Sequence, residues 1–396
     1  MNKLVITRWS GRTLTALLAD GVLQELSLEE EASILGNIYI GKVKNVVRNL
    51  NSAFVDFGEG RTGYYSLTEN PLSIHASGGS GAIKAGDEIV VQVAKEAVKT
   101  KDPVLTANLN FSGKYAVLTA GRPVVGFSAK IADKEWKDAL KPELEALTEG
   151  RMGLIIRTNA YQAGQEVLMR EISQLMEEYR QVLSDAPYRT CYSLLYQAQP
   201  GYIGTLNSFP EGTLEAIVTD DEAVYQKLSR YLKAYLPGQP GLLQRYADPL
   251  VSLLKLHGLE TALEQACQKR VWLKSGGYLV IEQTEAMVVI DVNTGKYSGK
   301  KSQDETIRRI NSEAAQEICH QLRLRNLSGI IMVDFIDMKA EEDNLLLLDM
   351  LKRCAIKDPV KTTVIDMTPL GLVELTRKKG RRPLAEQIGR IKERDS

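Results

Sequence analysis

The fold is decided by two stretches of similar pattern, MVVIDVN at residues 287–293 and IIMVDF at residues 330–335. Each is an apolar run, typical of a buried strand, that leads to an aspartate, Asp291 or Asp334. Between them, the apolar positions of residues 307–322 recur every three or four residues, which predicts one helix. A strand–helix–strand connection favours two neighbouring strands in one sheet. The sequence therefore predicts an α/β domain in which the two aspartates lie side by side.

The two aspartates are candidate metal ligands. A carboxylate at the end of a buried strand is expected to be desolvated and to need a partner, and two converging carboxylates repel each other unless a cation lies between them. Hard oxygen ligands suit magnesium or manganese better than zinc. Asn293 stands two residues after Asp291, where its amide can orient a carboxylate or a water. The alternative is that each aspartate caps a turn after its strand, and the pattern alone leaves both interpretations open.

The composition is that of an ordinary globular chain with several domains. The 396 residues are 44% hydrophobic and 25% charged, and 50 basic residues balance 50 acidic ones. This balance excludes a protein that coats nucleic acid or a membrane by bulk charge, although it leaves room for local basic patches. The four cysteines form no CxxC pair, which favours a reducing, cytoplasmic compartment. No signal peptide and no apolar run of about 18 residues is present, so we expect no membrane segment.

Along the rest of the chain, the pattern of apolar, polar and glycine residues changes near residues 36, 108, 188 and 266. Short alternating runs with glycine turns predict a small β-barrel between residues 36 and 107. Gly21 indicates a break after the first two strands. The individual elements that we expect are strands at 4–6, 13–18, 38–40, 53–57, 64–65, 89–93, 152–158, 330–335 and 362–365, helices at 167–180, 307–322 and 345–351, and a hairpin of 278–282 with 287–291.

Five motifs, in order along the chain, resemble those of the ribonuclease E/G family. They are NIYIGKV at 37–43, AFVDFG at 53–58, DVNTGK at 291–296, QLRLRNLSG at 321–329 and VDFIDM at 333–338. The resemblance runs from about residue 1 to about residue 382, and the sequence VNTG at 292–295 is more similar to the ribonuclease G branch.

The resemblance implies a multidomain α/β fold with an interrupted topology. It implies a deoxyribonuclease I-like catalytic domain at 266–382 and an RNase H-like domain in two parts, 1–35 and 188–265. An OB-fold RNA-binding domain at 36–107 and a 5′-sensor subdomain at 108–187 would be inserted into the RNase H-like domain. Residues 383–396 would form a basic C-terminal tail that either helps to hold RNA or is simply solvated.

The resemblance also implies an endoribonuclease that cleaves single-stranded RNA, is stimulated by a 5′-monophosphate, and acts in rRNA and tRNA processing and mRNA decay. Asp291 and Asp334 match the family's magnesium-binding aspartates, and Asn293 matches the asparagine that hydrogen-bonds within that site. Magnesium would polarise the scissile phosphate and activate a water, which leaves 5′-phosphate and 3′-hydroxyl ends. The alternative is an RNA-binding protein of the same fold with little or no nuclease activity.

A second set of residues matches the family's sensor of the RNA 5′ end: Gly113, Val117, Arg157 and Thr158. An arginine fork, a hydroxyl and a backbone amide suit a terminal 5′-monophosphate, which such a pocket grips through several oxygens. Without the resemblance, Arg157 is better interpreted as a surface arginine that follows a strand.

A third set matches positions that contact single-stranded RNA: Phe54, Tyr64, Lys101 and Lys361. Strand alternation places Phe54 on the same face as Asp56, where an aromatic ring is a platform for base stacking. The alternative on the pattern alone is that Phe54 is a core residue. The family often has phenylalanine at the position of Tyr64 and arginine at that of Lys361; stacking and positive charge survive both changes.

The chain departs from the family after the last motif. Family members usually carry a CPxC motif shortly after the catalytic domain, through which two chains share one zinc ion, and no such motif occurs up to Ser396. We therefore expect no structural zinc, and the resemblance does not carry a zinc-linked homodimer over to this chain.

Overall fold

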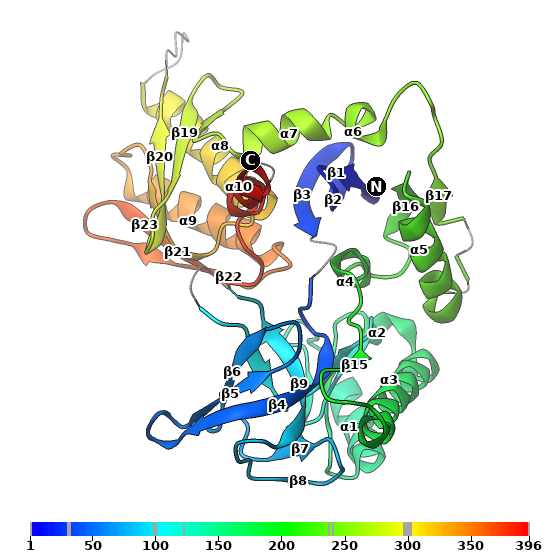
Figure 1. The fold of residues 1–396 in the computed structure, drawn as a ribbon. Helices are drawn as coiled ribbons and strands as arrows, with labels where there is room; N and C mark the ends of the chain where they lie inside the picture. Colours follow the sequence, from blue (N-terminus) through cyan, green and yellow to red (C-terminus); the bar gives the residue numbers. More distant parts are fainter. Residues whose placement is uncertain are drawn as a thin grey trace. The chain divides into compact units, whose positions relative to one another are not determined.

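The computed structural model describes residues 2–29, 33–97, 101–121, 123–236, 238–239, 241–295 and 303–394 (Figure 1). The chain divides into two compact units. The first unit combines Met1–Glu31 with Leu214–Ser396, and the second is Ala32–Thr213. Each unit has hydrophobic cores of its own.

The first sheet of the first unit joins the beginning of the chain to its later part. Its order is β17 (Leu243–Arg245), β16 (Leu214–Thr219), β1 (Asn2–Trp9), β2 (Arg12–Ala19) and β3 (Val22–Glu29). β1 runs parallel to β16 and antiparallel to β2. The helices of this part are α5 (Glu222–Tyr235), α6 (Leu253–Leu256) and α7 (Leu259–Ala266).

The expected break at Gly21 is wrong, because the glycine builds a hairpin. Asp20 and Gly21 have φ angles of 49° and 76°, and they connect the paired residues Ala19 and Val22. Positive φ at both central residues defines the two-residue turn that matches the twist of antiparallel strands. The Asp-Gly pair therefore starts β3 instead of ending the sheet.

The second sheet of the first unit carries the two aspartates. Its order is β18 (Arg270–Trp272), β19 (Tyr278–Gln283), β20 (Met287–Asn293), β21 (Gly329–Asp334), β23 (Leu372–Arg377) and β22 (Thr362–Met367). β20 and β21 are parallel and are connected through α8 (Gln303–Leu324), while α9 (Glu341–Ile356) leads to β22 (Figure 1). The expected hairpin, both helices and the strands at 330–335 and 362–365 are confirmed; β23, which lies between β21 and β22, was not predicted.

Helix α8 buries one stripe against this sheet. Ile310, Ala314, Ile318 and Leu322 share a core with alternate residues of β20 and β21, such as Ile290. Side chains on one face recur about every 3.6 residues in a helix and every two residues in a strand, so each element contributes one regular set of side chains to this core. The helices therefore cover one face of the sheet, and the other residues of the strands are left on the opposite face.

The first half of the second unit is a β-barrel. β4 (Ile38–Val47), β5 (Ser52–Asp56), β6 (Thr62–Ser66), β10 (Val104–Thr106) and β9 (Glu88–Lys95) pair in this order, and β9 pairs back onto β4. The expected barrel is confirmed, and this closed set of strands is consistent with an OB-fold. Shorter elements extend it: η1 (Arg48–Leu50), β7 (Ser73–His75), β8 (Ser80–Gly81) and β15 (Leu194–Tyr196).

The second half of this unit is a smaller sheet with helices. The sheet has the order β11 (Asn110–Ser112), β12 (Ala116–Thr119), β14 (Gly153–Ile156) and β13 (Val125–Phe127). α3 (Gln165–Asp185) packs its apolar stripe on this sheet and contains the helix expected at 167–180. The other helices are α1 (Lys134–Thr148), α2 (Ala160–Ala163), η2 (Ala186–Tyr188) and α4 (Gly201–Asn207).

The segment expected to be a basic tail contains a helix. Residues Leu384–Arg394 form α10, in which Leu384 is fully buried and Ile388 nearly so. The Gln387 side chain accepts a hydrogen bond from the backbone N–H of Leu28 in β3, at 3.0 Å. The basic residues of this segment therefore accompany an apolar docking stripe that a charge count does not reveal.

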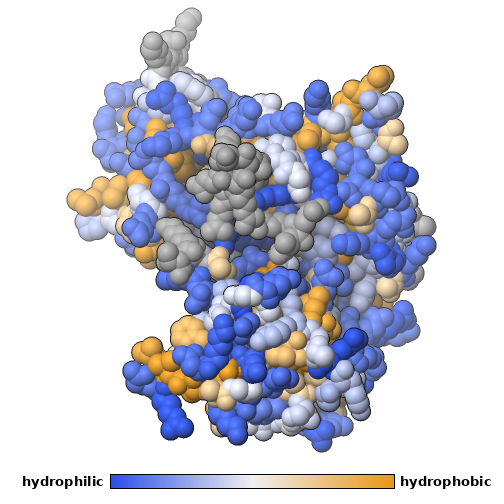
Figure 2. All heavy atoms as spheres, in the orientation of Figure 1, coloured by the Kyte–Doolittle hydropathy of each residue, from blue (hydrophilic) through white to orange (hydrophobic). Residues whose placement is uncertain are grey.

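The surface shows no large apolar belt in the view of Figure 2, where hydrophilic residues predominate and hydrophobic ones form small areas. Over the described part of the chain, no helix combines the length and the apolar character needed to cross a membrane.

Candidate functional site: a pair of aspartates, a turn held by a buried glutamate and an aromatic barrel face

Asp291, two residues before the end of β20, lies beside Asp334, the last residue of β21. The two residues are register partners of the parallel pair, and neighbouring strands lie about 4.8 Å apart. Their expected position side by side is confirmed. Both side chains are exposed, so the expected desolvation is wrong. The reason is strand alternation: Ile290 and Val333 point into the core, and the aspartates point to the open face.

Asn293 belongs to the same face as Asp291. Its Nδ2 donates to Asp291 Oδ2 at 2.7 Å, which orients that carboxylate and leaves its other oxygen available to a ligand. Among the described residues, no group of three or more His, Cys, Asp or Glu side chains is arranged to hold a metal ion. Two carboxylates nevertheless suit Mg²⁺, which usually keeps several waters and takes its remaining ligands from substrate phosphate.

A buried asparagine positions the chain after Asp334. Asn311 of α8 is 1% exposed; its Nδ2 donates to Ile336 O at 2.7 Å, and its Oδ1 accepts from Ile336 N at 3.2 Å. This pair of bonds ties the helix to the loop two residues beyond the aspartate. Asn311 was not predicted from the sequence, although it lies four residues after Ile307 and three before Ala314 of the helical stripe, which indicates a polar residue turned toward the protein.

The backbone beside Asn293 also depends on a glycine. A Cβ on Gly277 would fall 2.8 Å from the carbonyl oxygen of Asn293 and 3.1 Å from Ile310. Any larger residue would therefore displace the strand end that carries Asn293 and Asp291.

A buried network supports the start of β21. The guanidinium of Arg377, 4% exposed, donates to both carboxylate oxygens of Asp358, at 2.7 and 3.3 Å. Its Nη1 also donates to Asn326 Oδ1 and Leu327 O, both at 3.0 Å. Part of the motif at 321–329 thus serves to hold the strand that ends in Asp334.

Helix α8 is tied to β3 by charged groups. Nε2 of His320 lies 2.7 Å from Leu23 O, and Nδ1 lies 3.2 Å from Glu317 Oε1. Since both partners only accept, both ring nitrogens donate when the histidine is charged. The hydrogen bond with Glu317 accordingly raises the pKa of His320 above its usual value, although burial opposes it. Arg323 adds an ion pair to Glu25 at 2.8 Å.

In the second unit, the predicted sensor residues come together on neighbouring strands. Arg157 N donates to Tyr115 O at 2.8 Å, and Val117 is the register partner of Ile155. Gly113 N donates to Ala116 O at 2.9 Å, which closes the turn between β11 and β12. The two sequence segments of the predicted sensor are therefore adjacent in the fold.

Glu171 of α3, which was not predicted from the sequence, holds this turn. It is 3% exposed, and its carboxylate accepts from the backbone N–H groups of Lys114, Tyr115 and Ala116 at 2.8, 2.7 and 2.9 Å. Burial raises the pKa of Glu171, while these bonds and the charge of Arg157 oppose the shift. A Cβ on Gly113 would fall 2.3 Å from Glu171 Oε1, so only glycine leaves room for the carboxylate.

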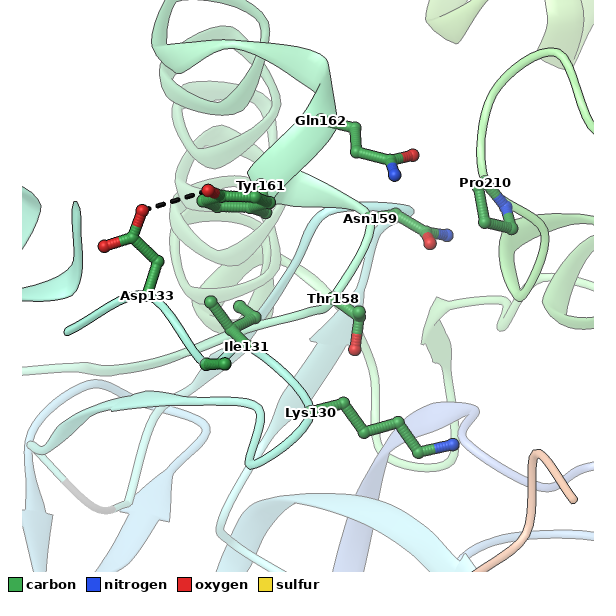
Figure 3. Close-up of a pocket in the computed structure, with 9 residues that line it drawn as sticks. Lys130, Ile131, Asp133, Thr158, Asn159, Tyr161, Gln162 and Pro210 are labelled. Carbon is green, nitrogen blue, oxygen red and sulfur yellow. Dashed lines mark hydrogen bonds between the residues drawn. The ribbon is translucent and has the colours of Figure 1, made fainter. Parts of the chain in front are cut away.

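A pocket of about 490 Å³ adjoins Thr158. It is lined by residues from the segments 130–133 and 158–162 and by Pro210 (Figure 3). Thr158 Oγ1 lies 3.0 Å from Ser128 Oγ, and Tyr161 donates its hydroxyl to Asp133 at 2.9 Å.

Two aromatic residues lie on the outside of the barrel. Phe54 and Tyr64 are register partners on β5 and β6, with ring centroids 6.2 Å apart at 78°. Both are half-buried, whereas Ala53 and Val55 on either side of Phe54 are buried. The alternative that Phe54 is a core residue is therefore wrong, because the core takes the other face of the strand.

The two predicted lysines are exposed and lie in different units. Lys101 precedes β10 of the barrel. Lys361 precedes β22, whose first residue pairs with Arg377, which in turn pairs with Gly329 at the start of β21. Lys361 lies one residue before Thr362 and Asp334 ends β21, so six residues of strand, roughly 20 Å at about 3.3 Å per residue, separate Lys361 from the level of the aspartate pair, and β23 lies between the two strands.

The chain is similar to known ribonucleases over most of its length. The sequence model of the Ribonuclease E/G family matches residues 110–380. Ribonuclease G of Haemophilus influenzae is 36% identical over 387 residues, which are 94% of this chain and 78% of the relative. Ribonuclease G of Escherichia coli K12 is 33% identical over 392 residues, 96% of this chain and 80% of the relative. Ribonuclease E of a Nostoc species is 32% identical over 382 residues, 95% of this chain and 56% of the relative.

Proposed function

Because the chain belongs to the ribonuclease E/G family, we propose that it cleaves single-stranded RNA with Mg²⁺, leaves 5′-phosphate and 3′-hydroxyl ends, and is stimulated by a 5′-monophosphate on the RNA. Its relatives are ribonucleases G and E, so the chain is an endoribonuclease, a hydrolase. This sets aside the alternative of an RNA-binding protein without activity. We propose rRNA and tRNA processing and mRNA decay as its roles. We propose the cytoplasm, where cysteine thiols stay reduced, as its location, because none of the four cysteines forms a disulfide.

The observation that carries the proposal is the register of Asp291 with Asp334. Mg²⁺, or Mn²⁺, held by this pair would polarise the scissile phosphate and lower the pKa of a bound water. Asn293 keeps the Asp291 carboxylate oriented through its 2.7 Å hydrogen bond. Asn311 fixes the loop that follows Asp334, so that the second carboxylate keeps its position when substrate binds.

Both units supply RNA contacts in this proposal: Lys361 belongs to the first unit and the other contacts to the second. The Phe54–Tyr64 pair offers sequence-tolerant stacking to unpaired bases, and Lys101 and Lys361 contribute charge for the phosphate backbone. Arg157 and Thr158, with the turn of Gly113 and Val117, form the site for the 5′-monophosphate. In family terms, the unit with the barrel contains the OB-fold and the sensor, inserted into an RNase H-like domain that precedes a deoxyribonuclease I-like one.

Cleavage of a labelled, A/U-rich single-stranded RNA tests the catalytic assignment. We expect Asp291→Asn and Asp334→Asn each to lose activity at least 100-fold, since each removes a charged metal ligand. Asp349→Asn is the matched control, because Asp349 pairs with Arg353 on the surface of α9. Near-normal cleavage by either aspartate variant would overturn the assignment.

The sensor is tested with one RNA that carries either a 5′-monophosphate or a 5′-hydroxyl. Wild-type protein should cleave the monophosphorylated form faster, and Arg157→Ala should equalise the two rates. Arg170→Ala, which changes an exposed arginine of α3, should leave the preference intact. Equal rates for wild-type protein would refute the sensor without affecting the catalytic assignment.

A further inference from the structure

We propose that the pocket beside Thr158 holds one nucleobase from the first two nucleotides of the RNA substrate. The inference rests on the proposed function, because it takes Arg157 and Thr158 as the site of the terminal phosphate. The volume of the pocket, about 490 Å³, lies in the ordinary range of small-molecule sites and leaves room for one nucleoside.

The first argument is the aromatic wall. Tyr161 is 46% exposed, and its ring is held in place at two edges. The hydroxyl donates to Asp133 at 2.9 Å, and the ring meets Trp136 edge-to-face, with centroids 5.3 Å apart at 84°. Figure 3 shows that the hydroxyl is directed at Asp133, away from Asn159 and Pro210. A pre-oriented aromatic ring in a pocket is what a stacked base requires.

The second argument is the polar side of the pocket. Lys130 and Gln162 extend their polar ends there in Figure 3, and among the described residues neither side chain has a hydrogen-bond or ion-pair partner. The Gln162 amide offers both a donor and an acceptor for a base edge, and the Lys130 ammonium suits a backbone phosphate.

The third argument is rigidity. Asn159 Nδ2 donates to the carbonyl oxygens of Asn207 and Phe209, at 2.8 and 3.1 Å, and so ties the segment after Arg157 to the segment that carries Pro210. The pocket is thus braced on both sides before any ligand arrives, which lowers the entropy lost on binding. Its place directly after the Arg157–Thr158 pair makes RNA the ligand that the chemistry favours.

Fluorescence anisotropy with a short, 3′-labelled, 5′-monophosphorylated RNA in EDTA tests the proposal. Removing the base of the first or second nucleotide should weaken binding by wild-type protein about 5- to 150-fold, the cost of one base stack. Tyr161→Leu should weaken binding of intact RNA by the same factor and should make no further difference to the abasic RNA. Tyr161→Phe keeps the ring but loses the hydrogen bond to Asp133, so it should bind intact RNA more tightly than Tyr161→Leu does and no more tightly than the wild type does.

Tyr188→Leu is the matched control, because Tyr188 is 89% exposed and outside the pocket. The proposal is overturned if both abasic RNAs bind as tightly as intact RNA, or if Tyr161→Leu weakens intact and abasic RNA equally. Failure of the phosphate sensor gives a different result: 5′-monophosphate and 5′-hydroxyl RNAs then bind equally, while the effect of the abasic site persists.

Discussion

The carboxylate of Glu171 is predicted to be the structural support of the proposed 5′-phosphate sensor. In Glu171→Gln, the side-chain oxygen can still accept from Tyr115 and Ala116, but an amide N–H₂ then faces the N–H of Lys114. One hydrogen bond to a charged group is lost and one buried donor is left unsatisfied. At about 1.5–3 kcal/mol for the hydrogen bond and about 1–3 kcal/mol for the unsatisfied donor, these losses add up to about 2.5–6 kcal/mol.

Two measurements check this prediction. Urea unfolding should show the loss of stability, and the ratio of cleavage rates for 5′-monophosphate over 5′-hydroxyl RNA should fall toward one, while cleavage of 5′-hydroxyl RNA by the folded fraction is retained. Glu166→Gln is the control, since Glu166 is an exposed residue of the same helix. If Glu171→Gln keeps both the stability and the preference of the wild type, the turn does not depend on this carboxylate.

Three further predictions concern the buried network of Arg377 and Asp358, the contacts of His320 between α8 and β3, and the barrel. Asp358→Ala leaves the charge of Arg377 buried without its partner and should cost about 3–5 kcal/mol in urea unfolding; a smaller effect than that of the exposed Asp349→Ala would contradict this. The pKa of His320 is raised in the folded state, so its contribution to stability is complete below the unfolded value of about 6.5 and disappears as pH rises through the folded value. His320→Gln should reduce the change of the unfolding free energy with pH over that window. A pH profile identical to that of the wild type would contradict this prediction. Phe54→Ala should weaken RNA binding, measured by fluorescence anisotropy, by about 1–3 kcal/mol, the contribution of one stacked base. Unchanged binding would show that this face of the barrel does not contact RNA.

Elements with a clear period were predictable from the sequence. The stripe of α8 and the apolar runs of β20 and β21 are local signals, and together they place Asp291 beside Asp334. The position of β23 between β21 and β22 is not local, because it depends on which strand pairs with β21 after the chain has passed through α9.

Buried charged residues were the main omission. Glu171 lies three residues after Leu168 and four before Leu175, both buried, so the helical period does place it on the packed face. The sequence does not say what would satisfy a carboxylate there, because its partners are backbone N–H groups of a distant turn. Arg377 is similar, since its acceptors come from segments up to 51 residues away.

The central claim is that Asp291 and Asp334 hold the catalytic metal ion, and a change of metal preference tests it most directly. Asp334→Cys replaces a hard oxygen ligand by a softer sulfur, which binds Mg²⁺ poorly and Mn²⁺ better. We predict that this variant cleaves RNA very slowly with Mg²⁺ and regains activity with Mn²⁺, whereas wild-type protein responds little to the exchange. Equal activity of Asp334→Cys with the two metals would contradict a direct bond between residue 334 and the metal.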